Sequence, residues 1–200
     1  MRPLIYSNAT AAAVFGVACL IWMVPEWLGW RRQMSRVARK QAATADGGSM
    51  TVLVLLQWIG LALNFVLAGL WRGAAIVWHP LAIFMLGIAL ILLGVGFRWY
   101  SIRTLGEYFT RDVAVSADQH VVERGPYLYV RHPSYTGTFV TMLGVGLATG
   151  NWASVICLLA CVFAGHYYRV RVEEEALVHA LGQPYVRYME RTKRFIPLVF

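Results

Sequence analysis

The sequence contains little charge and few acidic residues. Only 14% of its 200 residues are charged, and just 10 are Asp or Glu, whereas soluble domains carry about 25% charged residues. Hydrophobic residues make up 58% of the chain, more than the core of one soluble domain can bury. The composition therefore excludes an ordinary soluble domain and predicts a protein that lies in a lipid bilayer.

Cysteine is scarce as well. The three cysteines, Cys19, Cys157 and Cys161, lie in apolar stretches and form no Cys-x-x-Cys pair. The sequence therefore offers no disulfide framework and no thiolate metal site. We expect all three to pack as small hydrophobic side chains, and we expect no bound metal.

Motifs of soluble nucleotide-binding enzymes are missing. There is no P-loop, no His-Glu-x-x-His, no Gly-x-Ser-x-Gly, and no Gly-x-Gly-x-x-Gly after a strand, which argues against a dinucleotide-binding sheet. Gly94-x-Gly96 and Gly144-x-Gly146 lie inside apolar stretches. We interpret them as close-packing or flexible points of helices.

Five apolar stretches are predicted membrane helices, because a bilayer core needs about 20 apolar helical residues. The last two are shorter than the others and are separated only by Gly150 and Asn151, which predicts a tight helical hairpin. The expected fold class is all-α, a polytopic membrane protein with three helices in residues 1–100. Residues 101–200 are expected to hold a polar loop, the hairpin and a polar C-terminal segment. The five stretches are Ala9–Trp30, Thr51–Trp71, His79–Trp99, Tyr135–Thr149 and Trp152–Tyr168.

The basic residues predict the orientation of these helices. With five spans and the N-terminus outside, sixteen of the 18 basic residues fall on the cytoplasmic side, leaving only Arg2 and Arg72 outside. This distribution follows the positive-inside rule, so the C-terminal segment is expected to be cytoplasmic. It also explains the net charge of +8 without a nucleic-acid partner. The compact size is typical of a bacterial plasma-membrane protein.

A polar motif, residues 125–137 with the sequence GPYLYVRHPSYTG, precedes the fourth span. His132 is biased towards extended backbone by the proline after it, and Pro133 suits the first position of a helix. The free N–H groups of a helix start favour a carboxylate, and Arg131 adds a bidentate donor for the same kind of group. The tyrosines of the motif fit interfacial anchoring equally well.

Three consecutive acids, Glu173–Glu175, follow the fifth span. They point in different directions on a helix, so at least one is expected to face the membrane domain, where an acid is costly without a role. Arg169 either pairs with Glu173, four residues on, or extends to lipid phosphate. Beyond a predicted helix break at residues 181–184, an amphipathic surface helix carries two tyrosines on one face.

Together these segments resemble the isoprenylcysteine carboxyl methyltransferase family, whose relatives include the phospholipid N-methyltransferases. The resemblance covers residues 98–200, about half of the chain, and the first two helices carry no signature. It implies a membrane enzyme that binds S-adenosylmethionine between its last helices and its C-terminal segment. The matching residues are Leu105-Gly106, Val121–Tyr127, Arg131–Gly137, Arg169, Glu173-Glu174, Leu177, Gly182, Tyr185, Tyr188 and Ile196-Pro197.

The resemblance also implies individual site residues. For catalysis, near the reacting methyl and the acceptor, these are Arg169, Glu174 and Arg131. Which of the three consecutive acids faces the site stays open. The residues implied in cofactor binding are Val122, Gly125, Tyr127, Tyr129, Arg131, His132, Pro133, Tyr135, Glu173, Glu174 and Tyr185.

The expected function is methyl transfer from S-adenosylmethionine to a lipophilic acceptor, preferably the carboxylate of an isoprenyl-type or other lipid-like acid. Such a transfer destroys charge, so excluding water and aligning the reactants do most of the work. The expected partners are membrane lipids and a lipophilic or prenylated substrate that enters from the bilayer. The oligomeric state stays open.

Three alternatives remain at this point. The first is methylation of a phospholipid or another amine, for which Glu174 or His132 is the candidate base. The second is a membrane reductase that uses NADPH on a sterol-like or quinone-like substrate. The third is a membrane protein that binds or senses a small ligand without catalysis.

Overall fold

The computed structural model describes residues 3–37, 47–109 and 120–196, apart from the side chains of residues 30–37. Parts of the predicted basic linker and polar loop, residues 38–46 and 110–119, lie outside the described residues. The helices in chain order are α1 (Leu4–Ser7), α2 (Ala9–Val37), α3 (Ser49–Leu70), η1 (Arg72–Ala74), α4 (Pro80–Leu105), η2 (Gly106–Tyr108), η3 (Gly125–Leu128), α5 (Pro133–Ala148), α6 (Trp152–Leu181) and α7 (Gln183–Arg191).

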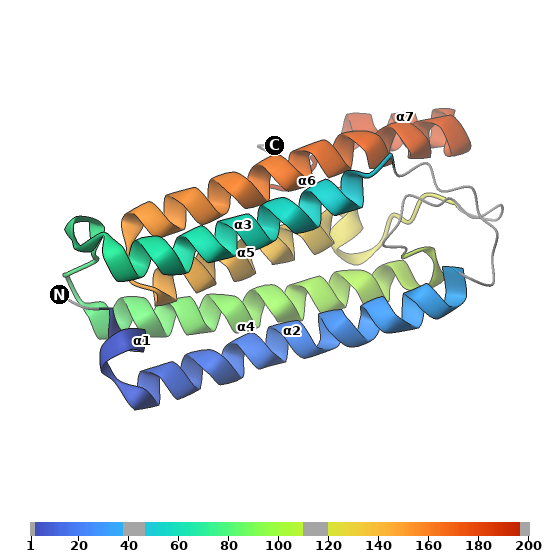
Figure 1. The fold of residues 1–200 in the computed structure, drawn as a ribbon. Coiled ribbons are helices and arrows are strands. Elements are labelled where there is room, and N and C mark those ends of the chain that lie inside the picture. The colour runs from blue at the N-terminus through green and yellow to red at the C-terminus, as the bar shows by residue number, and fades with distance from the viewer. Residues whose placement is uncertain (1–2, 38–46, 110–119, 197–200) are drawn as a thin grey trace.

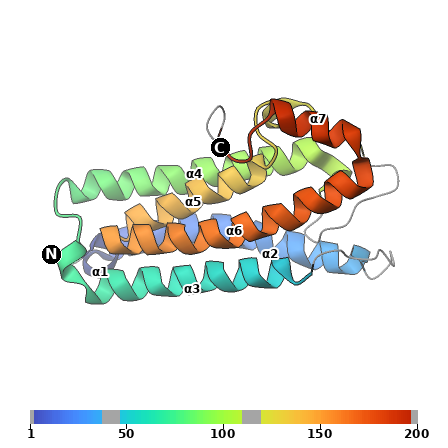
Figure 2. The same ribbon diagram turned by 90° about the horizontal axis from the view of Figure 1, so that it is seen from above.

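The architecture is an elongated bundle in which α2 to α6 lie side by side with roughly aligned axes (Figure 1). Within the described ranges every named element is a helix, and β pairing is limited to two isolated bridges. The predicted all-α class is therefore confirmed. Figures 1 and 2 place the N-terminus and the α5–α6 turn at one end of the bundle and α7 at the other.

Four segments of the described chain are long and apolar enough to cross a membrane: Ala9–Gly29, Ser49–Leu70, Pro80–Tyr108 and Trp152–Leu181. Large apolar side chains are exposed along them, as expected of helices that face lipid. The chain is thus an integral, multi-pass membrane protein.

The predicted fourth span is the short helix α5. It has 16 residues and is about 24 Å long at 1.5 Å per residue, less than a bilayer core of about 30 Å. By contrast, α6 has 30 residues and continues past the predicted end of the fifth span at Tyr168. The three consecutive acids therefore lie on the same helix as the membrane-spanning residues.

Close contact between α4 and α5 depends on glycine. A Cβ atom on Gly94 would lie 2.5 Å from the Thr141 amide nitrogen, and one on Gly144 would lie 2.6 Å from the Gly87 carbonyl oxygen. The close-packing interpretation of Gly94 and Gly144 is confirmed. It does not hold for Gly96, where a Cβ atom would meet nothing within 4 Å, because this residue lies on the outer side of α4.

The α5–α6 turn forms the predicted hairpin. Gly150 has a φ of +67°, which glycine adopts without strain, and the Asn151 side chain caps α6 by accepting from the Ser154 amide at 3.1 Å. Asn151 also donates to the Trp71 carbonyl at 2.8 Å. These bonds fix the end of α3 against the start of α6.

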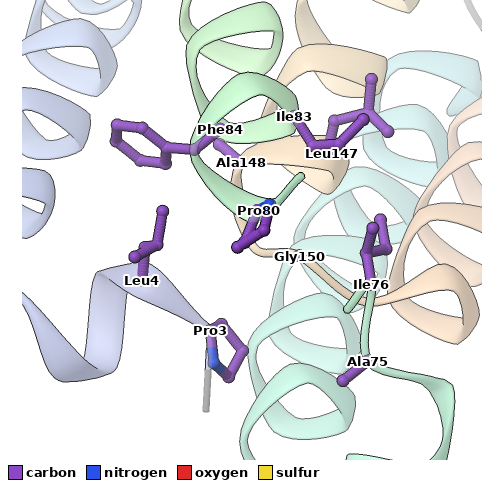
Figure 3. A pocket seen from close by; sticks show the side chains of 10 residues that line it. All are labelled: Pro3, Leu4, Ala75, Ile76, Pro80, Ile83, Phe84, Leu147, Ala148 and Gly150. Atoms are coloured by element: carbon purple, nitrogen blue, oxygen red, sulfur yellow. The ribbon is translucent and has the colours of Figure 1, made fainter. Parts of the chain in front are cut away.

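An apolar cavity lies at this end of the bundle, between α1, α4 and the α5–α6 turn (Figure 3). Its volume is about 20 Å³, enough for about one water molecule. Its lining includes Leu4, Ile83, Phe84 and Leu147 but no titratable side chain. This cavity offers no chemistry, so the polar groups at the opposite end of the bundle are the candidates for a site.

Candidate active site

The start of α5 is held by the C-terminal segment. The Arg131 amide donates to the Lys193 carbonyl at 2.7 Å, and the His132 amide donates to the Arg194 carbonyl at 3.0 Å. Pro133 is the first residue of α5, as predicted. Figure 2 shows α7 beside the segment that leads into α5. Residues distant in sequence therefore meet at this end of the bundle.

Glu174 of α6 is the centre of this meeting point. Its Oε1 atom accepts from Arg131 Nε at 2.8 Å and lies 3.3 Å from His132 Nε2, while its Oε2 atom accepts from Arg194 Nε at 2.9 Å and Arg194 Nη2 at 2.7 Å. A carboxylate has about four lone-pair positions, so these four contacts saturate it. Only 4% of its side chain is exposed. Glu174 thus ties α6, the α5 start and the C-terminal segment into one polar cluster.

Glu173 lies beside this cluster, but its carboxylate accepts fewer hydrogen bonds than that of Glu174. Its Oε2 atom accepts from the Tyr135 hydroxyl at 2.8 Å and lies 3.9 Å from His132 Nδ1, too far for a hydrogen bond. The rings of His132 and Tyr135 stack with centroids 5.6 Å apart and 14° between their planes. Since 28% of the Glu173 side chain is exposed, this carboxylate retains acceptor capacity.

The direction of each acid follows from its position on α6. Glu174 is buried, Glu173 is half-buried and Glu175 is exposed. The prediction that at least one acid faces inward is confirmed. Glu174 and Glu173 are the ones that meet the α5 start.

Helix α7 packs two tyrosines against the same region, as its predicted amphipathic pattern requires. The Tyr188 hydroxyl donates to the Tyr127 carbonyl at 2.7 Å, and Tyr185 is also buried. Burial raises the pKa of Tyr185 and of Tyr188 well above the usual range. Both hydroxyls are therefore protonated at neutral pH by a wide margin, and that of Tyr188 donates within the protein.

Arg131 is committed to contacts within the protein. In addition to Glu174, it donates through Nη1 to the Met189 carbonyl at 3.0 Å and to the Thr192 carbonyl. Its side chain is 8% exposed. Arg131 therefore fixes the end of α7 onto the Glu174 cluster.

Other predicted residues lie outside this cluster. The Tyr129 side chain is 65% exposed. Gly125 packs against the end of α4, since a Cβ atom there would lie 2.9 Å from the Tyr100 hydroxyl. Val122 is half-buried in the extended segment before Gly125. The cluster therefore unites Arg131, His132, Tyr135 and the two acids, but not these three.

Arg169 is fully buried, with 1% exposed. Its Nη1 atom donates to the Ser49 hydroxyl at 2.7 Å, at the N-terminus of α3. This burial rules out the alternative in which Arg169 extends to lipid phosphate. Its guanidinium lies against α3, whereas Glu174 on the same helix faces the α5 start.

Two features of the site were missed from the sequence. Arg194 lies outside every motif of the sequence, yet it supplies half of the contacts to Glu174. Arg98 of α4 pairs with Glu26 of α2, with 2.6 Å between Nε and Oε1, although 72 residues separate them. No local motif signals either contact, because both depend on how distant segments pack.

Comparison with known proteins identifies relatives that match the part of the chain containing the α5 start and the acids of α6. A family model described as phospholipid methyltransferase matches residues 82–184. Protein-S-isoprenylcysteine O-methyltransferase B of Arabidopsis thaliana is 31% identical over 115 residues, which cover 56% of this chain and 58% of that protein. Protein-S-isoprenylcysteine O-methyltransferase of Schizosaccharomyces pombe is 32% identical over 114 residues, which cover 56% of this chain and 48% of that protein. The chain spans about half the length of the curated relatives it matches.

A solved structure shares the fold. It is described as the eukaryotic intramembrane Ras methyltransferase ICMT (isoprenylcysteine carboxyl methyltransferase), and it superposes with a TM-score of 0.53 at 24% sequence identity. The match covers 76% of this chain and 53% of that chain. The resemblance expected from the sequence is confirmed.

Proposed function

Because the chain belongs to the phospholipid methyltransferase family, we propose that it transfers a methyl group from S-adenosylmethionine to a lipophilic acceptor at the membrane. The observation that carries this proposal is the Glu174 cluster. It joins α6, the α5 start and the C-terminal segment at one end of a lipid-facing bundle, and it leaves the neighbouring Glu173 with acceptor capacity.

The residues present fit the cofactor. When bound, S-adenosylmethionine supplies a sulfonium-activated methyl group. Glu173 suits its ammonium group or ribose hydroxyls, because the carboxylate is partly exposed and accepts a single hydrogen bond from the described residues, that of Tyr135. Glu174 is saturated, so its part is to fix His132 and Arg131. The remaining proposed cofactor-binding residues are Val122, Gly125, Tyr127, Tyr129, Pro133 and Tyr185.

The preferred acceptor is the carboxylate of an isoprenyl-type or other lipid-like acid. The residues that the resemblance implies for catalysis are Arg131, Arg169 and Glu174. Of these, we propose that an arginine contacts the acceptor and that Glu174, whose acceptor positions are filled by the protein, acts by holding Arg131 and His132 in place. Of the two arginines, Arg131 already donates through Nε and Nη1 within the protein, whereas Arg169 lies next to the lipid-facing helix α3. The planar guanidinium of Arg169 would hold a carboxylate that arrives from the bilayer and keep it aligned with the methyl group.

A phospholipid or other amine is the second candidate acceptor, favoured by the description of the matching family model. An amine must lose a proton before or during methylation. His132 is suited to take it, because its imidazole contacts Glu174 at 3.3 Å and the carboxylate would stabilise the protonated ring.

The topology proposed with this function has five spans, an external N-terminus and a cytoplasmic C-terminal segment. The positions of the 18 basic residues support it. The short helix α5 would then span only part of the bilayer, with the site at its cytoplasmic start.

Incubation of the purified protein with a membrane lipid extract and methyl-labelled S-adenosylmethionine tests the proposal. We expect a labelled lipid, identified by mass spectrometry, that releases labelled methanol in mild base, because a methyl ester hydrolyses there. Label that survives base as an N-methyl group would favour the amine acceptor. Absence of label from every lipid fraction would contradict the proposed function.

A further inference from the structure

An ion pair links α2 to α4 at the level of the site. Arg98 Nε lies 2.6 Å from Glu26 Oε1 and Arg98 Nη2 lies 3.2 Å from Glu26 Oε2, which is the two-pronged geometry of a strong guanidinium–carboxylate pair. The side chains are 13% and 22% exposed. This pair is therefore largely shielded from water.

Glu26 is an unusual residue for its position. It is the only acid among the first 45 residues, and it lies in Ala9–Gly29, a segment apolar enough to span a membrane. An acid in such a helix is costly unless it is paired and has a role. Helix α2 also lies outside residues 82–184, the part that matches the family model.

Arg98 makes a third contact, and this one leads to the site. Its Nη1 atom donates to the Ser134 carbonyl at 3.2 Å, in the first turn of α5. The next residue is Tyr135, whose hydroxyl donates to Glu173. At the same level, a Cβ atom on Gly137 would lie 2.8 Å from Arg98 Cβ, so α4 and α5 are in close contact where Arg98 begins.

We infer that Glu26 and Arg98 are positioning residues for the site. Glu26 holds the Arg98 guanidinium in the one orientation that points Nη1 at the Ser134 carbonyl, and this bond fixes the first turn of α5. The placement of His132 and Tyr135 against Glu173 and Glu174 then depends on a helix that the family match does not cover. The consequence for catalysis rests on the proposed methyl transfer, but the effect on α5 does not.

Three variants distinguish a pair that positions the α5 start from a pair that only stabilises the contact between α2 and α4. Glu26→Gln keeps the shape of the side chain and removes its charge. The exchange Glu26→Arg with Arg98→Glu restores an ion pair between α2 and α4, but a carboxylate at position 98 has no N–H to donate to Ser134. Glu123→Gln is the matched control, because it breaks an exposed pair with Arg191 of 3.0 Å that involves neither α2 nor α4.

The measurements are the methyl-transfer rate, the melting temperature, and deuterium uptake in a peptide covering residues 133–141 of the ligand-free protein. For Glu26→Gln we expect a rate at least tenfold lower and faster uptake in this peptide. The exchanged pair should recover the melting temperature while its rate stays low and its uptake stays fast. The control should match the wild type in all three.

Recovery of the methyl-transfer rate and of slow deuterium uptake in the exchanged pair would overturn the inference. The ion pair would then only stabilise the contact between α2 and α4. Wild-type uptake and rate in Glu26→Gln would overturn it as well, and this variant decides the question if the exchanged pair fails to fold. Absence of methyl transfer by the wild-type protein would count against the proposed function alone. In that case the deuterium uptake still decides whether the pair holds α5.

Discussion

Arg194 donates two N–H groups to a single oxygen of Glu174, at 2.9 and 2.7 Å, although 20 residues and the whole of α7 separate them. The hydrogen bond with Glu174 raises the pKa of the Arg194 guanidinium, so its charge is permanent. The contact closes the C-terminal segment over α6. It makes the polar cluster a product of tertiary packing and not of one motif.

Replacing Arg194 with Gln should loosen this closure. Glu174 would lose two of its four contacts, and because Arg194 is 27% exposed the free energy of unfolding should fall by only about 1 kcal/mol. Affinity for S-adenosylhomocysteine should fall as well, since the C-terminal segment holds the His132 backbone. Chemical denaturation in detergent measures the first effect and calorimetry the second. Lys193→Gln, a change to an exposed neighbour, serves as the control, and an equal loss in both variants would contradict this role.

Glu174→Gln should lower the free energy of unfolding more than a substitution of any neighbouring residue does. The substitution leaves the buried Arg131 and the partly exposed Arg194 without their shared countercharge, and removing one partner of a buried pair costs about 3 kcal/mol or more. We expect a clear drop in melting temperature by differential scanning fluorimetry. Glu175→Gln changes an exposed acid on the same helix and should have no effect. A variant at Glu174 as stable as the wild type would show that the cluster is not what holds these segments together.

The sequence predicted the helices because their determinants are local. Apolar runs, Pro133 and Gly150-Asn151 set the starts of α2 to α6 and the hairpin to within a few residues. The pattern of Arg131, His132, Glu173 and Glu174 also identified most of the cluster, because these residues lie in two compact motifs that meet once α5 and α6 pack.

The sequence did not predict contacts that depend on how whole helices pack. Arg194 reaches Glu174 only because residues 193–194 pair with residues 131–132. Glu26 meets Arg98 only because α2 lies along α4. The helix break predicted at residues 181–184 is confirmed, since α6 ends at Leu181 and α7 begins at Gln183. Hydropathy alone did not show that the apolar fifth span and the acids after it form one continuous helix.

The burial of Arg169 makes lysine the informative replacement. Lysine keeps the charge but loses the planar fork, and we expect the methyl-transfer rate to fall by a factor of about ten to a hundred if one aligned interaction in the transition state is lost. Cofactor affinity should change little. Initial rates with labelled cofactor measure this, with Arg171→Lys, an exposed residue two positions away, as the control. Full activity of Arg169→Lys would remove Arg169 from the catalytic residues.

The proposed topology predicts that the two ends of the bundle face opposite sides of the membrane. Single cysteines at Ser7 and at Arg187, both exposed, should react with an impermeant thiol reagent from opposite sides of sealed vesicles. The native cysteines are half-buried in helices, and the unmodified protein provides the background. Labelling of both positions from the same side would contradict an odd number of spans.

Glu173, beside the Glu174 cluster, is the residue through which we propose that this end of the bundle binds S-adenosylmethionine. Isothermal titration of the detergent-purified protein with S-adenosylhomocysteine tests it most directly, with NADPH as the competing ligand and Glu173→Gln as the variant. We predict saturable binding of S-adenosylhomocysteine, no binding of NADPH, and an affinity about tenfold lower in Glu173→Gln, the loss of one charge-assisted hydrogen bond. Binding of NADPH in place of S-adenosylhomocysteine, or equal affinity in the wild type and the variant, would contradict the account.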